Sequence, residues 1–216
     1  MGNTAFKKKF AIVFWGVITL GIVSVVVLFW MITKGWLGYL PPLDELQNPK
    51  NKYATEIISS DMELLGRYYR NENRVSVNYT DISPNMINAL IATEDVRYYD
   101  HTGVDVKSLL RAVMKLGKAG GGSTITQQLV KVATGDSAHS ASRKAREIGS
   151  ALYLTDNWSK HKILASYMNL VYYGNGAYGI YEASMTYFDC EPKDLNIAQA
   201  AVLASIPNSP DFLNPY

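Results

Sequence analysis

The chain has 216 residues, of which 48% are hydrophobic and 12% are aromatic. This is enough apolar material for one sizeable domain with a packed core, which excludes a disordered chain. The 21 basic and 19 acidic residues nearly balance, so net charge does not indicate nucleic acid or another charged partner. The single cysteine, Cys190, cannot form an intramolecular disulfide and is interpreted as a small buried hydrophobic residue.

The N-terminus contains the first predicted element. Three consecutive lysines, Lys7 to Lys9, precede Phe10–Thr33, which is a run of 24 residues without a charge. As a helix this run is about 36 Å long, enough to cross a bilayer and too long for the apolar part of a signal peptide. We predict a cytoplasmic tail over 1–9 and an uncleaved transmembrane anchor over 10–33. Because the lysines are expected to stay in the cytoplasm, the chain after about residue 34 is expected on the outer side of the membrane.

The rest of the chain is predicted to be mainly α. Residues 34–52 contain three prolines and are typical of a linker, and the polar turn between Thr55–Ser59 and Glu63–Tyr69 predicts a small hairpin. Only this one hairpin interrupts a pattern that is otherwise helical. The apolar spacing predicts helices over 82–99, 105–117, 124–134, 140–155, 160–173, 178–188 and 196–205.

Glu94 is the first candidate for chemistry. Ser83 and Pro84 are typical of a helix start, and the apolar spacing after them, at Ile87 and Leu90, continues into Glu94. A carboxylate therefore falls on the stripe that is expected to face the interior. The spacing alone does not say what it does there.

A second stretch, GGSTITQQLVK at residues 121–131, predicts a helix start with a polar side. Thr124 and Gln127 fit the capping box, and Gln128 and Lys131 fall on the same helix side as this pair. Such a side is typical of a solvated amphipathic helix. The glycines before the helix N-terminus favour a second interpretation, a site for anionic oxygens.

A third stretch, SRKARE at residues 142–147, places two cations one helical turn before a carboxylate. Arg143 and Lys144 precede Glu147 by four and three residues, which is typical of surface ion pairs. The alternative is a cationic pair that binds a phosphate beside a carboxylate. The chain's three histidines lack metal-ligand spacing, so no zinc site is predicted.

Five stretches in order resemble the motifs of the peptidoglycan glycosyltransferase family, glycosyltransferase family 51, found in class A penicillin-binding proteins and monofunctional transglycosylases. They are Glu94-Asp95-x-x-Tyr98-x-x-His101-x-Gly103, GGSTITQQLVK at 121–131, RKxxE at 143–147, KILASYMNLVYYGNGAYGI at 162–180 and AQAAVLASIPNSP at 198–210. The resemblance covers residues 53–216. It implies a lysozyme-like, mainly helical domain on the outer face of a bacterial cell membrane.

The resemblance also implies an activity and a site. The family polymerises lipid II into glycan strands by inverting glycosyl transfer and releases polyprenyl diphosphate. Glu94 matches its catalytic base, for which burial is favourable because it disfavours the charged carboxylate. Glu147 matches the second catalytic glutamate, on the donor side, whereas Asp95 and His101 are expected to hold the loop. The matched substrate-binding residues are Thr124, Gln128, Lys131, Arg143 and Lys144.

Cofactors and partners follow from the same resemblance. The sequence requires no cofactor, although a divalent cation, Mg or Mn, could bridge the diphosphate to Glu147. The expected partners are lipid II, the growing glycan strand and the membrane, with other cell-wall synthesis proteins as candidates and no nucleic acid. No Ser-x-x-Lys acylation site is recognised, so penicillin binding is not predicted. A lysozyme-like enzyme that cleaves glycan, or a weakly active cell-wall scaffold, remains the alternative.

Overall fold

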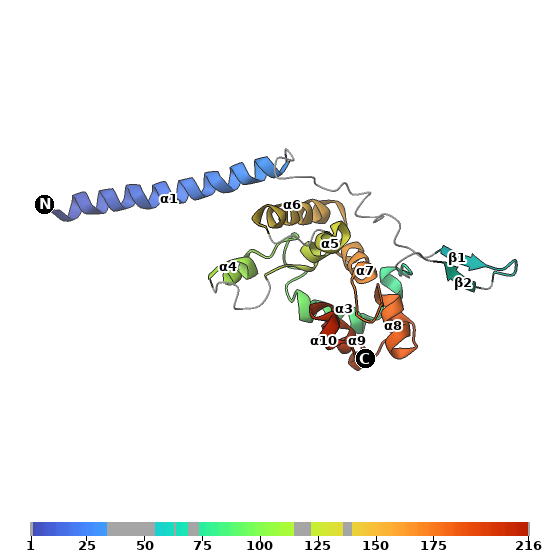
Figure 1. The fold of residues 1–216 in the computed structure, drawn as a ribbon. Coiled ribbons are helices and arrows are strands. Elements are labelled where there is room, and N and C mark those ends of the chain that lie inside the picture. Colours follow the sequence, from blue (N-terminus) through green and yellow to red (C-terminus); the bar gives the residue numbers. More distant parts are fainter. Residues whose placement is uncertain are drawn as a thin grey trace.

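The structure is a computed structural model that describes residues 2–33, 55–62, 64–68, 74–114, 122–135 and 140–215. Its described part is mainly helical, which confirms the mainly α part of the predicted fold class (Figure 1). The helices are α1 (Gly2–Thr33), α3 (Pro84–Glu94), α4 (Val106–Met114), α5 (Ile125–Thr134), α6 (Ala141–Asn157), α7 (Lys160–Leu170), α8 (Ile180–Phe188), α9 (Ile197–Ser205) and α10 (Pro210–Leu213). Short 3-10 turns are η1 (Tyr79–Asp81), η2 (Pro192–Asp194) and η3 (Ile206–Asn208).

The N-terminal helix α1 is a single long rod that passes beside α6 and extends away from the other helices (Figure 1). Many of its described apolar side chains are exposed to solvent, with Phe10 and Leu20 at 62% and 69%. Among the residues that the structure describes, no helix combines the length and the apolar character needed to cross a membrane. The predicted linker over 34–52 lies outside the described residues.

The predicted hairpin is confirmed. Strand β1 (Thr55–Ile58) pairs antiparallel with β2 (Leu64–Tyr68), with Thr55 opposite Tyr68 and an irregular register between Ile57 and Ile58. The hairpin stands to one side of the helices (Figure 1). Glu63 and Tyr69, at its predicted edges, lie outside the described residues.

The core lies where α3 packs against α9 and where α5 packs against α6 and α7. Fully buried side chains from these helices fill it, such as Leu90 of α3, Leu129 of α5 and Leu203 of α9. Burying one leucine contributes about 1.5–3 kcal/mol. The buried residues of α3, α5 and α9 belong to one hydrophobic cluster.

The predicted helix starts are accurate to within two residues because polar caps specify them locally. Thr124 forms a capping box with Gln127 at α5, and Ser140 and Ser159 accept hydrogen bonds from backbone N–H groups at α6 and α7. The capping residue Asn196 does the same at α9.

Two predicted helices run too far. The first ends at Glu94 rather than at 99, because Asp95 leaves the helical conformation with φ −157°. The other, α7, ends at Leu170 rather than at 173. At this observed end the buried Arg74 donates to the carbonyl oxygens of Asn169 and Leu170 at 3.3 and 2.6 Å. A cation on the last carbonyls of a helix is a favourable C-terminal cap.

Candidate active site

A cleft of about 860 Å³ opens between the end of α3, the loop that follows it, and helices α4, α5 and α6. Glu94 lies on its wall, and so does Glu147. The two glutamates therefore line one cleft. The structure also brings every predicted substrate-binding residue to the lining: Thr124, Gln128, Lys131, Arg143 and Lys144.

Glu94 is the last residue of α3 and is half-buried, not enclosed in the core as the apolar stripe predicts. The helix stops at this residue, so the carboxylate opens onto the cleft rather than continuing into the interior. Its Oε2 accepts a hydrogen bond from Gln128 Nε2 at 2.8 Å. The Oε1 atom of Gln128 in turn accepts one from the Tyr167 hydroxyl at 2.9 Å.

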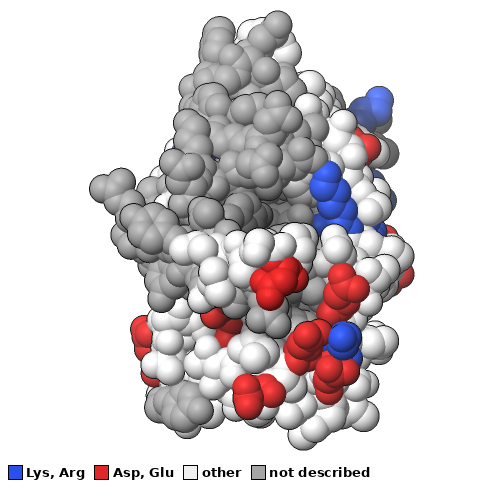
Figure 2. Space-filling model, turned by 90° about the vertical axis from the view of Figure 1, so that its right-hand side faces the viewer, with Lys and Arg blue, Asp and Glu red and all other residues white. Residues whose placement is uncertain are grey.

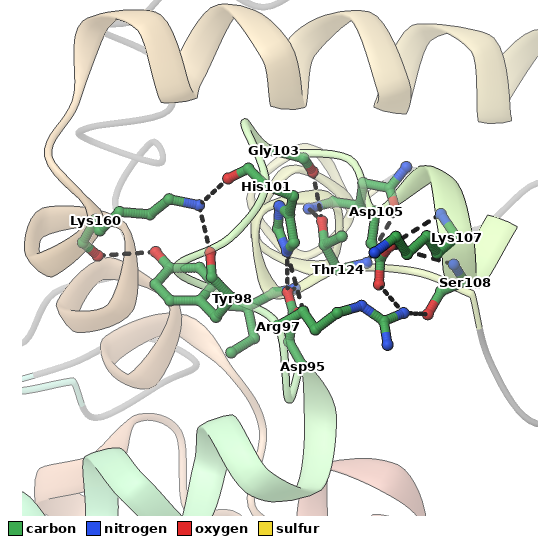
Figure 3. Close-up of polar contacts among 12 residues, drawn as sticks. Asp95, Arg97, Tyr98, His101, Gly103, Asp105, Lys107, Ser108, Thr124 and Lys160 are labelled. Carbon is green, nitrogen blue, oxygen red and sulfur yellow. Dashed lines mark hydrogen bonds and ion pairs between the residues drawn. The ribbon is translucent and has the colours of Figure 1, made fainter.

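Asp95 and His101 hold the loop after α3, which is the role predicted for them. Both Asp95 carboxylate oxygens lie 3.0 Å from His101 Nε2, and Oδ2 also accepts from the Ile125 N–H at 3.0 Å (Figure 3). Because Ile125 is the first residue of α5, the buried carboxylate satisfies an otherwise free N–H at the positive end of that helix.

Lys160 holds the same loop from the other side, and no sequence pattern predicts this contact. Its Nζ donates to the carbonyl oxygens of Tyr98 and His101, each at 2.6 Å, while the Tyr98 hydroxyl donates to the Lys160 carbonyl at 2.8 Å (Figure 3). Burial lowers the pKa of Lys160, which the nearby Asp95 charge partly opposes. Tyr98 itself is fully buried.

Thr124 is a structural cap in this arrangement. Its hydroxyl donates to the Gly103 carbonyl at 2.6 Å and accepts from the Gln127 N–H at 3.2 Å, and the residue is 1% exposed. Gly103 allows this approach, because it has φ +91° and a Cβ there would lie 2.6 Å from the Ala151 carbonyl oxygen. The Thr124 hydroxyl, which was predicted to contact the substrate, therefore already makes two hydrogen bonds within the protein.

The RKxxE stretch forms the cationic wall of the cleft. Glu147 is only 5% exposed. Arg143 Nη1 donates to its Oε2 at 2.5 Å, and Lys144 Nζ donates to its Oε1 and also to Ser123 Oγ, the latter at 2.8 Å. These are not ordinary surface ion pairs, because the shared carboxylate is buried. The third predicted cation, Lys131, lies exposed in the last turn of α5.

Arg97, Ser108 and Arg111 line the cleft on the α4 side and were not predicted. The Arg97 Nη2 atom lies 2.5 Å from Asp105 Oδ2 and 2.9 Å from Ser108 Oγ (Figure 3). Burial opposes ionisation of Asp105, but hydrogen bonds from Ser108 and Arg97 outweigh it and lower the pKa to about 2. Asp105, directly before the helix that starts at Val106, is a local N-cap signal that could have drawn attention to this wall.

Contrary to the prediction that no Ser-x-x-Lys site occurs, Ser159 and Lys162 fit that pattern. In the structure Ser159 caps α7 by accepting from the Lys162 N–H at 3.2 Å. The Lys162 ammonium lies 4.2 Å from the centre of the Trp158 ring. This pair is therefore a helix cap beside a cation–π contact, in which Lys162 is not directed at the serine hydroxyl as a base.

The charge of the cleft differs from that of the face at the α8 end of the molecule. On that face Figure 2 shows acidic side chains gathered in the lower half, with the described lysines and arginines scattered. The cations that line the cleft come instead from the loop after α3 and from α4, α5 and α6. The described part of the chain is thus a mainly helical domain in which a carboxylate and a cluster of cations meet in one cleft.

Comparison with known proteins identifies the family. A family model described as Transglycosylase matches residues 61–216. Penicillin-binding protein 1A of Neisseria flavescens is 42% identical over 181 residues, which cover 82% of this chain and 22% of that protein. Penicillin-binding protein 1F of Bacillus subtilis (strain 168) is 37% identical over 214 residues, which cover 97% of this chain and 30% of that protein.

A third relative, penicillin-binding protein 2a of Streptococcus pneumoniae, is 42% identical over 139 residues, which are 64% of this chain and 19% of that protein. The chain thus spans less than a third of the length of these relatives. Because the family model covers most of the chain, the chain belongs to the transglycosylase family, as its five motifs indicated.

Proposed function

We propose that this domain is a peptidoglycan glycosyltransferase that polymerises lipid II into glycan strands by inverting transfer and releases polyprenyl diphosphate. Its family membership supports the reaction class. The observation that carries the proposal is the shared cleft, in which Glu94 and the cations Lys131, Arg143 and Lys144 line one cavity of about 860 Å³. Such a cavity has the size of a ligand site and offers both a proton acceptor and an anion site.

In the proposed reaction Glu94 acts as the general base. The acceptor hydroxyl oxygen forms a bond to the anomeric carbon of the donor, and its proton passes to the Glu94 carboxylate. The bond from the anomeric carbon to the diphosphate oxygen breaks, and its electron pair leaves on that oxygen. A half-buried carboxylate that faces the cleft is placed to accept such a proton.

The cationic wall would stabilise the leaving diphosphate. Arg143 and Lys144 are 17% and 32% exposed and are held in place by the buried Glu147. Fixed cations that need no reorganisation stabilise a group that gains negative charge during the reaction. Glu147 then supports the donor side by orienting these two cations, because both its oxygens are occupied by them.

A divalent cation remains a prediction of the family resemblance. Arg143 and Lys144 already contact both oxygens of Glu147, so a bridging cation would compete with these two ion pairs. The described residues contain no group of three His, Cys, Asp or Glu side chains that could hold a metal ion. The residues therefore do not fit the bridging role, and no step of the mechanism depends on the metal.

We also propose that residues 10–33 anchor the domain in the cell membrane, with residues 1–9 in the cytoplasm and the cleft outside. The support is the uncharged run of 24 residues after Lys7 to Lys9 and the continuous helix Gly2–Thr33. The growing strand and other cell-wall synthesis proteins are the proposed partners.

Incubation of the full chain with lipid II and, separately, with finished peptidoglycan tests the proposal. Growth of a glycan polymer supports it. Cleavage of finished glycan would favour the lysozyme-like alternative. If neither activity is found, the scaffold interpretation remains.

Glu94→Gln then tests the base, because it keeps the shape of the side chain but cannot take the proton. We expect turnover to fall by roughly 10²-fold or more with unchanged thermal stability. Near wild-type polymerisation by a folded Glu94→Gln protein would exclude Glu94 as the base.

A further inference from the structure

Two partly buried hydrogen bonds in series lie behind the Glu94 carboxylate. The Tyr167 hydroxyl, from α7, donates to Gln128 Oε1 at 2.9 Å. Gln128, from α5, donates through Nε2 to Glu94 Oε2 at 2.8 Å. Tyr167 is fully buried in the core, so its ring cannot move without disturbing the packing of α5 on α7.

The direction of these hydrogen bonds is fixed by chemistry. An ionised carboxylate only accepts hydrogen bonds, so Gln128 must present its NH₂ group to Glu94 and its carbonyl oxygen to the other side. Burial, reinforced by the charge of Glu94, raises the pKa of Tyr167. Tyr167 therefore keeps its proton and always offers a donor to the Gln128 oxygen.

We propose that Tyr167 is a positioning residue that acts through Gln128 to set the orientation of the base. This inference rests on the proposed function. The hydrogen bond from Gln128 holds Oε2 of the carboxylate, and no described residue hydrogen-bonds to its other oxygen, Oε1. That oxygen is the one left to take the proton of the acceptor hydroxyl in the cleft.

Tyr167→Phe removes only the hydroxyl and lets the Gln128 amide rotate. One lost hydrogen bond of about 1.4 kcal/mol corresponds to a decrease of about 10-fold in kcat. We expect the KM for lipid II to change by less than about 2-fold, because the acceptor and donor contacts remain. Tyr173→Phe is the matched control, since Tyr173 is also fully buried but its hydroxyl has no hydrogen-bond partner among the described residues.

Gln128→Met tests the same path without removing a core group. It keeps the length of the side chain but donates no hydrogen bond, so the ionised base loses a stabilising partner. The acidic limb of the pH profile of kcat/KM should move to higher pH. Adding Tyr167→Phe to Gln128→Met should then change neither kcat nor the pH profile further, because Tyr167 acts only through Gln128.

The outcomes separate the two proposals. If the wild type does not polymerise lipid II, the proposed function fails. If the wild type polymerises and Glu94→Gln does not, the proposed function stands and the inference is tested separately. A wild-type kcat in Tyr167→Phe overturns the inference. An unchanged pH profile in Gln128→Met, or additive losses in the double variant, also overturns it. Melting temperatures of all variants show whether a loss of turnover reflects unfolding. Should Tyr167→Phe fail to fold, the pH profile of Gln128→Met decides.

Discussion

Glu147→Gln should destabilise the domain far more than the loss of an ordinary surface ion pair. The wild-type carboxylate is 5% exposed and is shared by two cations. Replacing it with a neutral amide leaves Arg143 and Lys144 close together without a compensating charge. Breaking a fully buried pair costs about 3–5 kcal/mol.

The loss of stability in Glu147→Gln should be smaller than for a fully buried pair, because Arg143 and Lys144 are 17% and 32% exposed and can regain part of their hydration. We therefore expect a loss of about 2 kcal/mol. For a domain of this size, this corresponds to a decrease in Tm of about 4–8 °C. Thermal unfolding of the full chain in one detergent and buffer measures it.

The chain offers a matched control in Glu191→Gln. Glu191 pairs with Lys193 at 2.9 Å, but the two side chains are 56% and 59% exposed. Because exposed ion pairs contribute little to stability, removing this pair should lower Tm by at most about 1–2 °C. Equal decreases in Tm for the two variants would show that the Glu147 network contributes no more than a surface pair.

Three further predictions concern the anion site, the α4 wall and the N-terminus. Arg143→Ala should reduce turnover of lipid-linked donor, whereas Lys193→Ala, an exposed control, should not; equal turnover in the two proteins would remove Arg143 from the diphosphate site. Asp105 has a pKa of about 2 in the folded protein against 3.8 for an ordinary aspartate, so its ionised form stabilises the fold above about pH 4 and this contribution is lost as pH falls toward 2. Denaturant titrations should accordingly show that Asp105→Asn is less stable than wild type at about pH 6, with a gap that closes as the pH falls toward 2; a gap independent of pH would contradict the assignment. Deleting residues 1–33 should preserve polymerisation of detergent-dispersed lipid II but lower it on vesicles at low protein density, and an equal loss in both assays would argue against an anchoring role.

The local features of this chain could be predicted from sequence because neighbouring residues specify them. The N-caps at Thr124, Ser140 and Ser159 are read from short polar patterns, and the structure places a helix after each. The spacing of RKxxE likewise predicts that Arg143 can contact Glu147. Only the structure shows that this carboxylate is buried, because its burial depends on how α6 packs against α5.

Contacts between distant segments could not be predicted in the same way. Lys160 binds the carbonyl oxygens of a loop about 60 positions earlier, and Tyr167 reaches Gln128 on another helix. In the sequence, Tyr167 is one aromatic residue on a helix whose apolar side is expected to pack, and nothing marks its hydroxyl as a partner of the site. Apolar periodicity reports which side of a helix is buried but not which polar atom meets which.

At the end of α3, Asp95 has no proposed chemical role, but it determines the position of Glu94, which is the proposed base. Asp95 leaves the helical conformation, and its carboxylate accepts a hydrogen bond from the free N–H of Ile125 and contacts His101. Had α3 continued to residue 99, as the apolar spacing predicts, Glu94 would lie within a helix side packed on the core. Because the chain turns away at Asp95, Glu94 becomes the last helical residue, supported on one side by Gln128 and open on the other to the cleft. A base needs both a fixed position and access to its substrate, and the end of a well-packed helix supplies the two together.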